Sequence, residues 1–201
     1  SKQKFTVLAA IPEVATASTV FDEGDQTLRA AAPGQPPFAG RLDTPAGRTA
    51  FEAWLKALLG EAARPDLKVV YAAGHRFMDH PQGHVSLVNL ASVRDLEAKM
   101  GVELDPLRFR ANVYVEGWPA WAENDWTGRS LMVGFARARV FKPIVRCAAT
   151  HVDPHTGQRD LDVVKALFDH YGHTLCGIYA HVEAGGPVTV GDAVTTPQEA
   201  A

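Results

Sequence analysis

One cysteine, Cys147, stands where the sequence could place a reactive thiolate. It follows the stretch 141–145 and the basic residue Arg146, and the sequence Asp-Pro-His-Thr-Gly comes after it at 153–157. Proline and glycine at these places predict a turn, so Cys147 is expected between the end of a strand and a turn. A positive neighbour favours the thiolate, the form of cysteine that binds metal ions. The alternative is a small buried hydrophobic residue, the usual role of a lone cysteine in an apolar neighbourhood.

A second group of polar side chains lies in the stretch 107–115. Arg108, Arg110 and Asn112 alternate there with apolar residues. Because alternate residues of a strand point to the same face, the pattern predicts a strand with two guanidinium groups and one amide on one face. Such donors suit an oxyanion or the edge of a heterocycle. The alternative is a polar strand face that meets water.

Histidine is a further candidate for chemistry. All eight histidines lie between His75 and His181. For His151 two interpretations stay open: an ordinary polar loop residue, which its place beside the turn favours, and a catalytic proton-transfer residue. A zinc site that combines Cys147 with two histidines is also considered, although no pair has the spacing of a familiar zinc motif.

The elements that must position these residues are indicated by local signals. Thr44-Pro45 predicts the start of a helix, and apolar residues recur at helical spacing from Phe51 to Leu59, before Gly60. Further helices are predicted over 91–100 and 159–171. Hairpins are predicted within 11–43, and strands over 5–10, 67–72, 107–115, 130–133, 136–142, 175–182 and 188–190. Many short strands with few helices favour a β-barrel or sandwich with helices on its flank.

Composition limits the class of protein. The chain has 201 residues, which favours one domain or slightly more, and its net charge of −3 argues against general nucleic-acid binding. Residues 108–146 contain seven basic and three acidic residues, a local positive field that suits a small anion. Two cysteines indicate a reducing, cytoplasmic compartment, with Cys176 in the core. No apolar run approaches the ~18 residues of a membrane span.

Four stretches in this order carry a resemblance to a known family: RFRANVYVEG (108–117), AENDW (122–126), VRCAATHVDPHTGQR (145–159) and PVTVGDAV (187–194). They resemble the MOSC domain, named after the C-terminal part of molybdenum-cofactor sulfurases, and most closely the branch that contains the mitochondrial amidoxime-reducing component. The resemblance implies a mainly β fold with flanking helices (α+β). A MOSC-type β-barrel at 74–194 would follow part of the family's N-terminal β-rich region at 1–73 and precede a flexible tail at 195–201.

The resemblance also implies a role for each candidate residue. Cys147 would coordinate molybdenum, for which a soft thiolate is a suitable ligand. Among the residues expected to bind the cofactor, Arg110, Asn112, Arg146 and Asp79 follow from the resemblance, and Arg108 is included because its guanidinium group suits the pterin phosphate. Guanidinium groups suit the pterin phosphate, an amide can both donate and accept at the pterin edge, and Asp79 would lie near the metal. The sequence departs from the family's pattern at Val145, where a serine often stands two residues before the metal-binding cysteine.

The implied function is that of a molybdenum-dependent oxidoreductase. It would bind the molybdenum cofactor (Mo-molybdopterin) and reduce small N-hydroxylated compounds, with Cys147 and His151 as catalytic residues. Electrons would come from a separate electron-donor protein, because the sequence has no flavin, haem or iron–sulfur motif. The alternatives are a carrier of the cofactor or of sulfur on Cys147 without turnover, and an inactive module that makes protein contacts. Binding of pyridoxal phosphate is a further possibility from the family, but no lysine stands in a context suited to a Schiff base.

Overall fold

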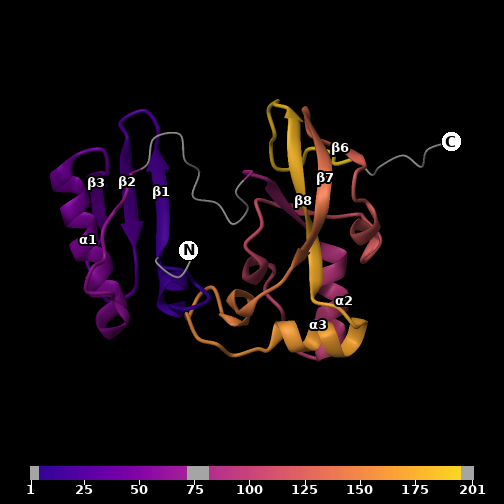
Figure 1. Ribbon diagram of the computed structural model, residues 1–201, viewed down its shortest axis with the longest axis horizontal. Coiled ribbons are helices and arrows are strands. Elements are labelled where there is room, and N and C mark those ends of the chain that lie inside the picture. The colour runs from indigo at the N-terminus through magenta and orange to yellow at the C-terminus, as the bar shows by residue number, and fades with distance from the viewer. Residues whose placement is uncertain (1–4, 72–81, 196–201) are drawn as a thin grey trace. The chain divides into compact units, whose positions relative to one another are not determined.

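The structure, a computed structural model, describes residues 5–71 and 82–195 (Figure 1). The chain divides into two compact units, residues 1–75 with 151–161, and residues 76–150 with 162–201. The segment 151–161 therefore belongs to the first unit although it follows Cys147 in the sequence, which no sequence signal indicated. The predicted domain boundaries stay predictions.

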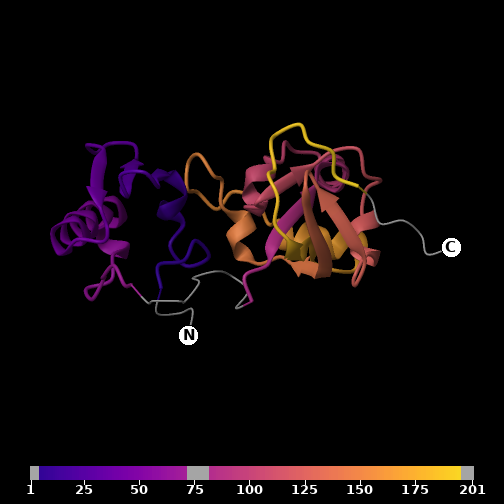
Figure 2. The same cartoon turned by 90° about the horizontal axis from the view of Figure 1, so that it is seen from above.

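The first unit is a three-stranded antiparallel sheet with one helix. The strands lie in the order β1 (Ser18–Asp22), β2 (Thr27–Ala31), β3 (Phe38–Arg41), and the helix α1 (Pro45–Leu59) packs beside β3 (Figures 1 and 2). Thr44 caps the helix, because its Oγ1 accepts a hydrogen bond from the Gly47 amide at 3.1 Å. The helix ends at Gly60. The predicted hairpins and the predicted helix are confirmed.

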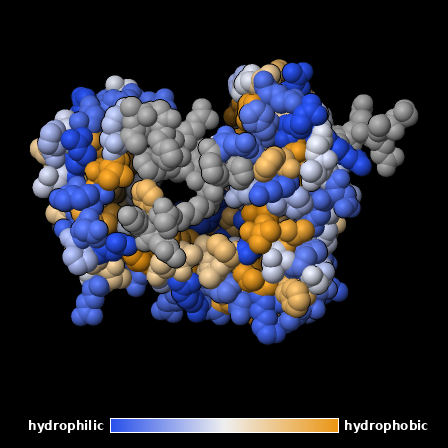
Figure 3. Space-filling model, in the orientation of Figure 1, coloured by the Kyte–Doolittle hydropathy of each residue, from blue (hydrophilic) through white to orange (hydrophobic). Residues whose placement is uncertain are grey.

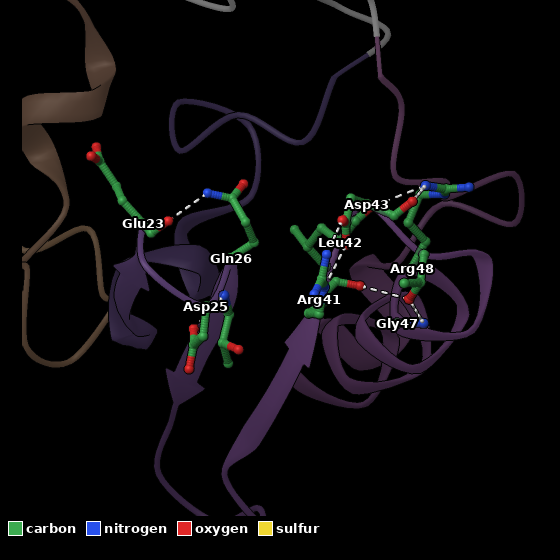
Figure 4. A network of polar contacts seen from close by, with 10 residues as sticks. Glu23, Asp25, Gln26, Arg41, Leu42, Asp43, Gly47 and Arg48 are labelled. Atoms are coloured by element: carbon green, nitrogen blue, oxygen red, sulfur yellow. Dashed lines mark hydrogen bonds and ion pairs between the residues drawn. The ribbon is translucent and has the colours of Figure 1, made fainter.

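Polar contacts fix the connection between β3 and α1 (Figure 4). The guanidinium of Arg41 pairs with the carboxylate of Asp43 at 2.5 Å, and Arg48 donates from Nη1 to the carbonyl oxygens of Leu42 and Asp43, both at 3.0 Å. On the face of α1 toward the sheet, Phe51 stacks on Trp54 with ring centroids 5.8 Å apart. Trp54 therefore belongs to the apolar stripe predicted from Phe51 to Leu59.

The segment 151–161 forms the predicted turn. The Oδ1 atom of Asp153 accepts hydrogen bonds from the backbone amides of His155 at 2.8 Å and Thr156 at 2.7 Å. A bridge pairs Val152 with Arg159, whose guanidinium donates to the carbonyl of Ala9 at 2.6 Å. These contacts tie the turn to the beginning of the described chain within the first unit.

The second unit is built on a curled, mixed five-stranded sheet in the order β5-β4-β8-β7-β6 (Figure 1). Strands β4 and β5 are parallel and the other neighbours antiparallel. The strands are β4 (Val85–Asn89), β5 (Val113–Val115), β6 (Ser130–Val133), β7 (Ala136–Val145) and β8 (Leu175–Ala184), and the helices are α2 (Leu90–Met100) and α3 (Val163–Tyr171). The half-barrel with flanking helices confirms the predicted α+β class.

Buried apolar side chains form the core of the second unit. The central residues come from all five strands and from the loop before β6: Leu87, Val115, Trp118, Trp126, Leu131, Val140 and Ile178. Trp118 and Trp126 meet edge to face with centroids 4.8 Å apart. Both tryptophans are therefore core residues.

The carboxylate of Glu123, from the stretch AENDW, is completely buried. Its two oxygens accept hydrogen bonds from Asn89 Nδ2 and Ser92 Oγ, both at 2.8 Å. The Ser92 hydroxyl in turn accepts from the backbone amide of Trp121 at 2.8 Å. This buried network ties the loop that carries AENDW to the start of α2.

Some predicted elements are wrong, because local hydrogen bonds compete with strand pairing. The stretch 107–115 begins with a 3-10 helix η4 (Pro106–Phe109), capped by a hydrogen bond of 2.8 Å from the Leu107 amide to Asp105 Oδ1. In the predicted strand 5–10, the amides of Ala10 and Ile11 both bond to the carbonyl of Val7, which makes a turn.

Three further predicted elements differ from the structure. In the described part of 67–72, Val69 donates to the carboxylate of Glu52 at 2.9 Å and no strand forms. At 188–190 the Thr189 amide bonds to Asp192 Oδ2 at 2.8 Å, which makes a turn. The helix predicted from 159 begins only at Val163, because Asp162 caps it by accepting from the Lys165 amide.

Both units present a mostly polar surface on the face that Figure 3 shows, with smaller apolar patches between the polar residues. Among the described residues, no helix combines the length and the apolar character needed to cross a bilayer. The cytoplasmic location stays a prediction.

Candidate cofactor site

A pocket of about 270 Å³ lies in the second unit, beside the end of β7. Its walls come from η4 and the loop after it, from the stretch 144–150 that contains Cys147, and from β4 and β8. Its lining consists of His84, Ser86, Arg108, Phe109, Arg110, Asn112, Ile144, Val145, Arg146, Cys147, Ala149, Thr150 and Tyr179. Five of the predicted site residues therefore come together in one pocket.

The thiol of Cys147 is exposed at this pocket. Cys147 follows β7 by two residues, and the 3-10 helix η6 (Ala148–His151) comes directly after it. The backbone amide and the hydroxyl of Thr150 both donate to the Cys147 carbonyl, at 3.0 and 2.9 Å, which fixes the backbone at this point. The predicted position between a strand end and a turn is confirmed.

The other cysteine is unsuited to the same chemistry. Cys176 lies in β8 and is 0% exposed, and burial raises the pKa of its thiol to about 12. It is therefore a protonated core residue at neutral pH, as predicted. The chain offers a ligand a single accessible thiol, that of Cys147.

Two of the three guanidinium nitrogens of Arg146 make hydrogen bonds within the protein. The residue is 9% exposed, and its Nε donates to the Cys176 carbonyl at 2.7 Å while Nη1 donates to the Phe109 carbonyl at 2.9 Å. Its guanidinium also lies 5.2 Å from the centroid of the Phe109 ring. Burial lowers the pKa of the group. Arg146 thus links β7, β8 and η4 around the pocket.

The third nitrogen of the Arg146 guanidinium makes no hydrogen bond to the described residues. Nη2 of Arg146 is buried and has no hydrogen-bond partner among the described residues. Gly177, in β8, leaves room beside it: a Cβ there would lie 3.1 Å from Nη2 and 2.4 Å from the Leu87 carbonyl oxygen, and the φ of +74° also favours glycine. A buried donor without a partner is costly, so Nη2 is suited to an acceptor on a bound ligand.

Arg108, Arg110 and Asn112 line the pocket although they do not share a strand face. Arg108 is buried in η4, whereas Arg110 caps η4 in the left-handed conformation with φ of 49°. That conformation costs a non-glycine residue roughly 1–2 kcal/mol, and strained residues of this kind cluster at functional sites. Asn112 Oδ1 accepts from the Ser86 hydroxyl at 2.9 Å and amide at 3.0 Å, so its amide nitrogen is the part suited to a ligand.

Two predicted site residues, Asp79 and His151, are not among the described residues that line the pocket. Asp79 lies outside the described residues. His151 ends η6 and belongs to the first unit, so its catalytic role stays a prediction. Within residues 5–71 and 82–195, no group of three or more His, Cys, Asp or Glu side chains could hold a metal ion.

One pocket residue suited to chemistry, His84, was not among the predicted site residues. It lies directly before β4, is 4% exposed and packs on the Phe141 ring with centroids 4.3 Å apart. In the sequence it is one of three histidines in the stretch 73–84, AGHRFMDHPQGH. Its signal was its position next to the apolar run 85–89, which ties it to the sheet.

Comparison with known proteins identifies the class. The MOSC domain profile matches residues 74–195, so the chain belongs to the MOSC domain family. The resemblance inferred from the four stretches is confirmed.

Individual relatives share about a quarter to a third of their residues with this chain over the matched part. Mitochondrial amidoxime reducing component 2 of Bos taurus is 33% identical over 122 residues, which are 55% of this chain and 36% of that protein. Mitochondrial amidoxime-reducing component 1 of Homo sapiens is 26% identical over 148 residues, covering 68% and 41% of the two chains. Molybdenum cofactor sulfurase of Bos taurus is 32% identical over 93 residues, covering 40% and 10%. The match thus spans about a third of the length of amidoxime reducing component 2 of Bos taurus and of Homo sapiens.

Proposed function

We propose that this pocket binds the molybdenum cofactor, with the Cys147 thiolate as the protein ligand of the metal. The observation that carries the proposal is an exposed thiol in the same pocket as three guanidinium groups, those of Arg108, Arg110 and Arg146. Softness matching favours thiolate for the metal, and guanidinium groups favour an anionic pterin phosphate and oxo groups.

The donor set fits such a group in charge and in hydrogen bonding. The buried Nη2 of Arg146 would gain an acceptor, and the amide nitrogen of Asn112 would donate to the pterin edge. Arg110, more exposed than Arg108, would meet the phosphate. The pocket lining includes no lysine that could form a Schiff base, so these residues give pyridoxal phosphate no comparable support.

We further propose reduction of small N-hydroxylated compounds as the activity. When bound, the cofactor would supply two-electron redox chemistry, and electrons would reach it from a separate donor protein. The proposal is supported by membership of the MOSC family and by similarity to proteins named as amidoxime-reducing components. The second candidate, a carrier of the cofactor or of sulfur, is favoured by the similarity to molybdenum cofactor sulfurase.

Metal analysis and a turnover assay test the proposal together. Protein purified from a molybdenum-replete host is expected to contain molybdenum at about one atom per chain, because the pocket has one accessible thiol. It is also expected to reduce benzamidoxime to benzamidine with reduced methyl viologen as electron donor. Protein that binds molybdenum without turnover would support the carrier instead. Molybdenum-free protein from such a host would contradict both.

A further inference from the structure

We propose that His84 is the proton donor in the pocket and that His181 resupplies it from solvent. The inference rests on the proposed function and adds a catalytic residue to it. Reduction of an N-hydroxylated compound breaks the N–O bond, consumes two electrons and two protons, and releases water. The reduced molybdenum group would supply the electrons, so the protein must supply at least the proton that goes to the departing oxygen.

The chemistry of the pocket lining favours His84 for this role. Its other polar groups are three guanidiniums, which keep their protons, hydroxyl and amide groups, the Tyr179 phenol and the Cys147 thiol assigned to the metal. Histidine is the side chain that ordinarily exchanges protons near neutral pH. Among the residues that line the pocket, His84 is the one histidine.

The position of His84 is well fixed. Its ring packs on Phe141 of β7 and faces Tyr179 of β8, with centroids 4.3 and 6.5 Å away. At 4% exposure the imidazole belongs to the pocket wall rather than to the outer surface. A catalytic acid must be held at a defined place, and this packing meets that requirement.

A second histidine connects this ring to solvent. His181 is exposed on β8, and its ring meets that of His84 edge-on with centroids 5.7 Å apart. This separation is within the reach of one bridging water molecule. A proton taken up by His181 could therefore pass to His84 and then to the substrate oxygen.

Several charged side chains lie on the elements that surround His84. The charged or titratable groups around His84 are Arg108, Arg110, Arg146, Cys147 and Tyr179 at the pocket, Arg137, Arg139 and Lys142 on β7, and His181 and Glu183 on β8. Apart from Glu183, which pairs with Arg137 and Arg139, the charged groups among them are basic and suit an anionic cofactor.

The test uses His84→Gln, which keeps hydrogen-bonding groups but cannot donate a proton in the same way. We expect unchanged molybdenum content and a kcat for benzamidoxime about 100-fold lower. The decline of kcat with rising pH in the wild type should disappear in the variant, because no acid is left to lose its proton. His181→Gln should lower kcat by less, and added imidazole should restore it. His170→Gln, an exposed histidine at the end of α3, is the matched control.

A readout other than activity comes from NMR of protein labelled at histidine. Benzamidoxime should shift the His84 imidazole resonance and leave that of His170 in place. An unmoved His84 resonance, or a His84→Gln variant with wild-type kcat and pH profile, would overturn the inference. Wild-type protein without molybdenum would instead overturn the proposed function, and the NMR shift would still decide whether His84 faces the substrate.

Discussion

The Cys147→Ser variant is expected to retain less than about a tenth of the molybdenum found in the wild type. A serine hydroxyl is a hard donor that stays protonated near neutral pH, so it cannot replace a thiolate as a ligand. The variant should fold normally, because the Cys147 side chain is exposed and its backbone carbonyl still accepts from Thr150. Molybdenum analysis of the two purified proteins, with thermal unfolding as the check on folding, measures the effect.

The matched control is Cys176→Ala. It removes the other thiol, which is buried in β8, and should lower stability while leaving the molybdenum content unchanged. Equal molybdenum in wild type and Cys147→Ser would mean that the pterin contacts alone retain the cofactor. In that case Cys147 would lose its assigned role.

The Arg146→Met variant is expected to lower the free energy of unfolding by about 3 kcal/mol. It removes two buried hydrogen bonds from a charged donor to the carbonyls of Phe109 and Cys176, each worth about 1.5–3 kcal/mol. Removing a buried charge offsets part of this loss. Arg146→Lys keeps the charge, but a single ammonium group lacks the fork that reaches both carbonyls, so it should lie between wild type and Arg146→Met.

Urea unfolding followed by tryptophan fluorescence measures this difference. Arg129→Met is the control, because Arg129 is exposed, and its effect should stay within about 0.5 kcal/mol. If Arg146→Met proved as stable as wild type, the guanidinium would not hold the pocket together. Its role would then be limited to contact with a ligand.

Elements with strong local signals could be predicted from the sequence. Thr44 before Pro45 marked the start of α1. Gly101 and Gly172 stand directly after the predicted helices 91–100 and 159–171, and both adopt the left-handed conformation at the ends of α2 and α3. These signals act on the first or last turn of a helix, so they do not depend on contacts with distant parts of the chain. The start of α3 was missed, because the bridge between Val152 and Arg159 takes up the preceding residues.

The stretch 107–115 illustrates the opposite case. Its alternation of apolar and polar residues fits a strand, but the Asp105 cap turns the chain into η4, and only Val113–Val115 pairs with β4. Arg108, Arg110 and Asn112 still line the pocket. The residue types therefore indicated the chemistry correctly although the local structure was wrong.

Contacts between residues far apart in the chain could not be predicted from the sequence. The two carbonyls bound by Arg146 belong to residues 37 and 30 positions away, so nothing local shows that this guanidinium holds the pocket. The same applies to His84, whose neighbours Phe141 and His181 come from β7 and β8. Pairing of the strands had to be known before either residue could be interpreted.

The most direct test of the central claim is the alkylation rate of each cysteine by iodoacetamide, followed by peptide mass spectrometry on wild-type protein with and without molybdenum. We expect Cys147, which is exposed, to react readily in molybdenum-free protein and to be protected in the molybdenum-containing form. Cys176, which is buried, should stay unmodified in both. Equally rapid alkylation of Cys147 in fully metal-loaded protein would contradict the claim that its sulfur binds the metal.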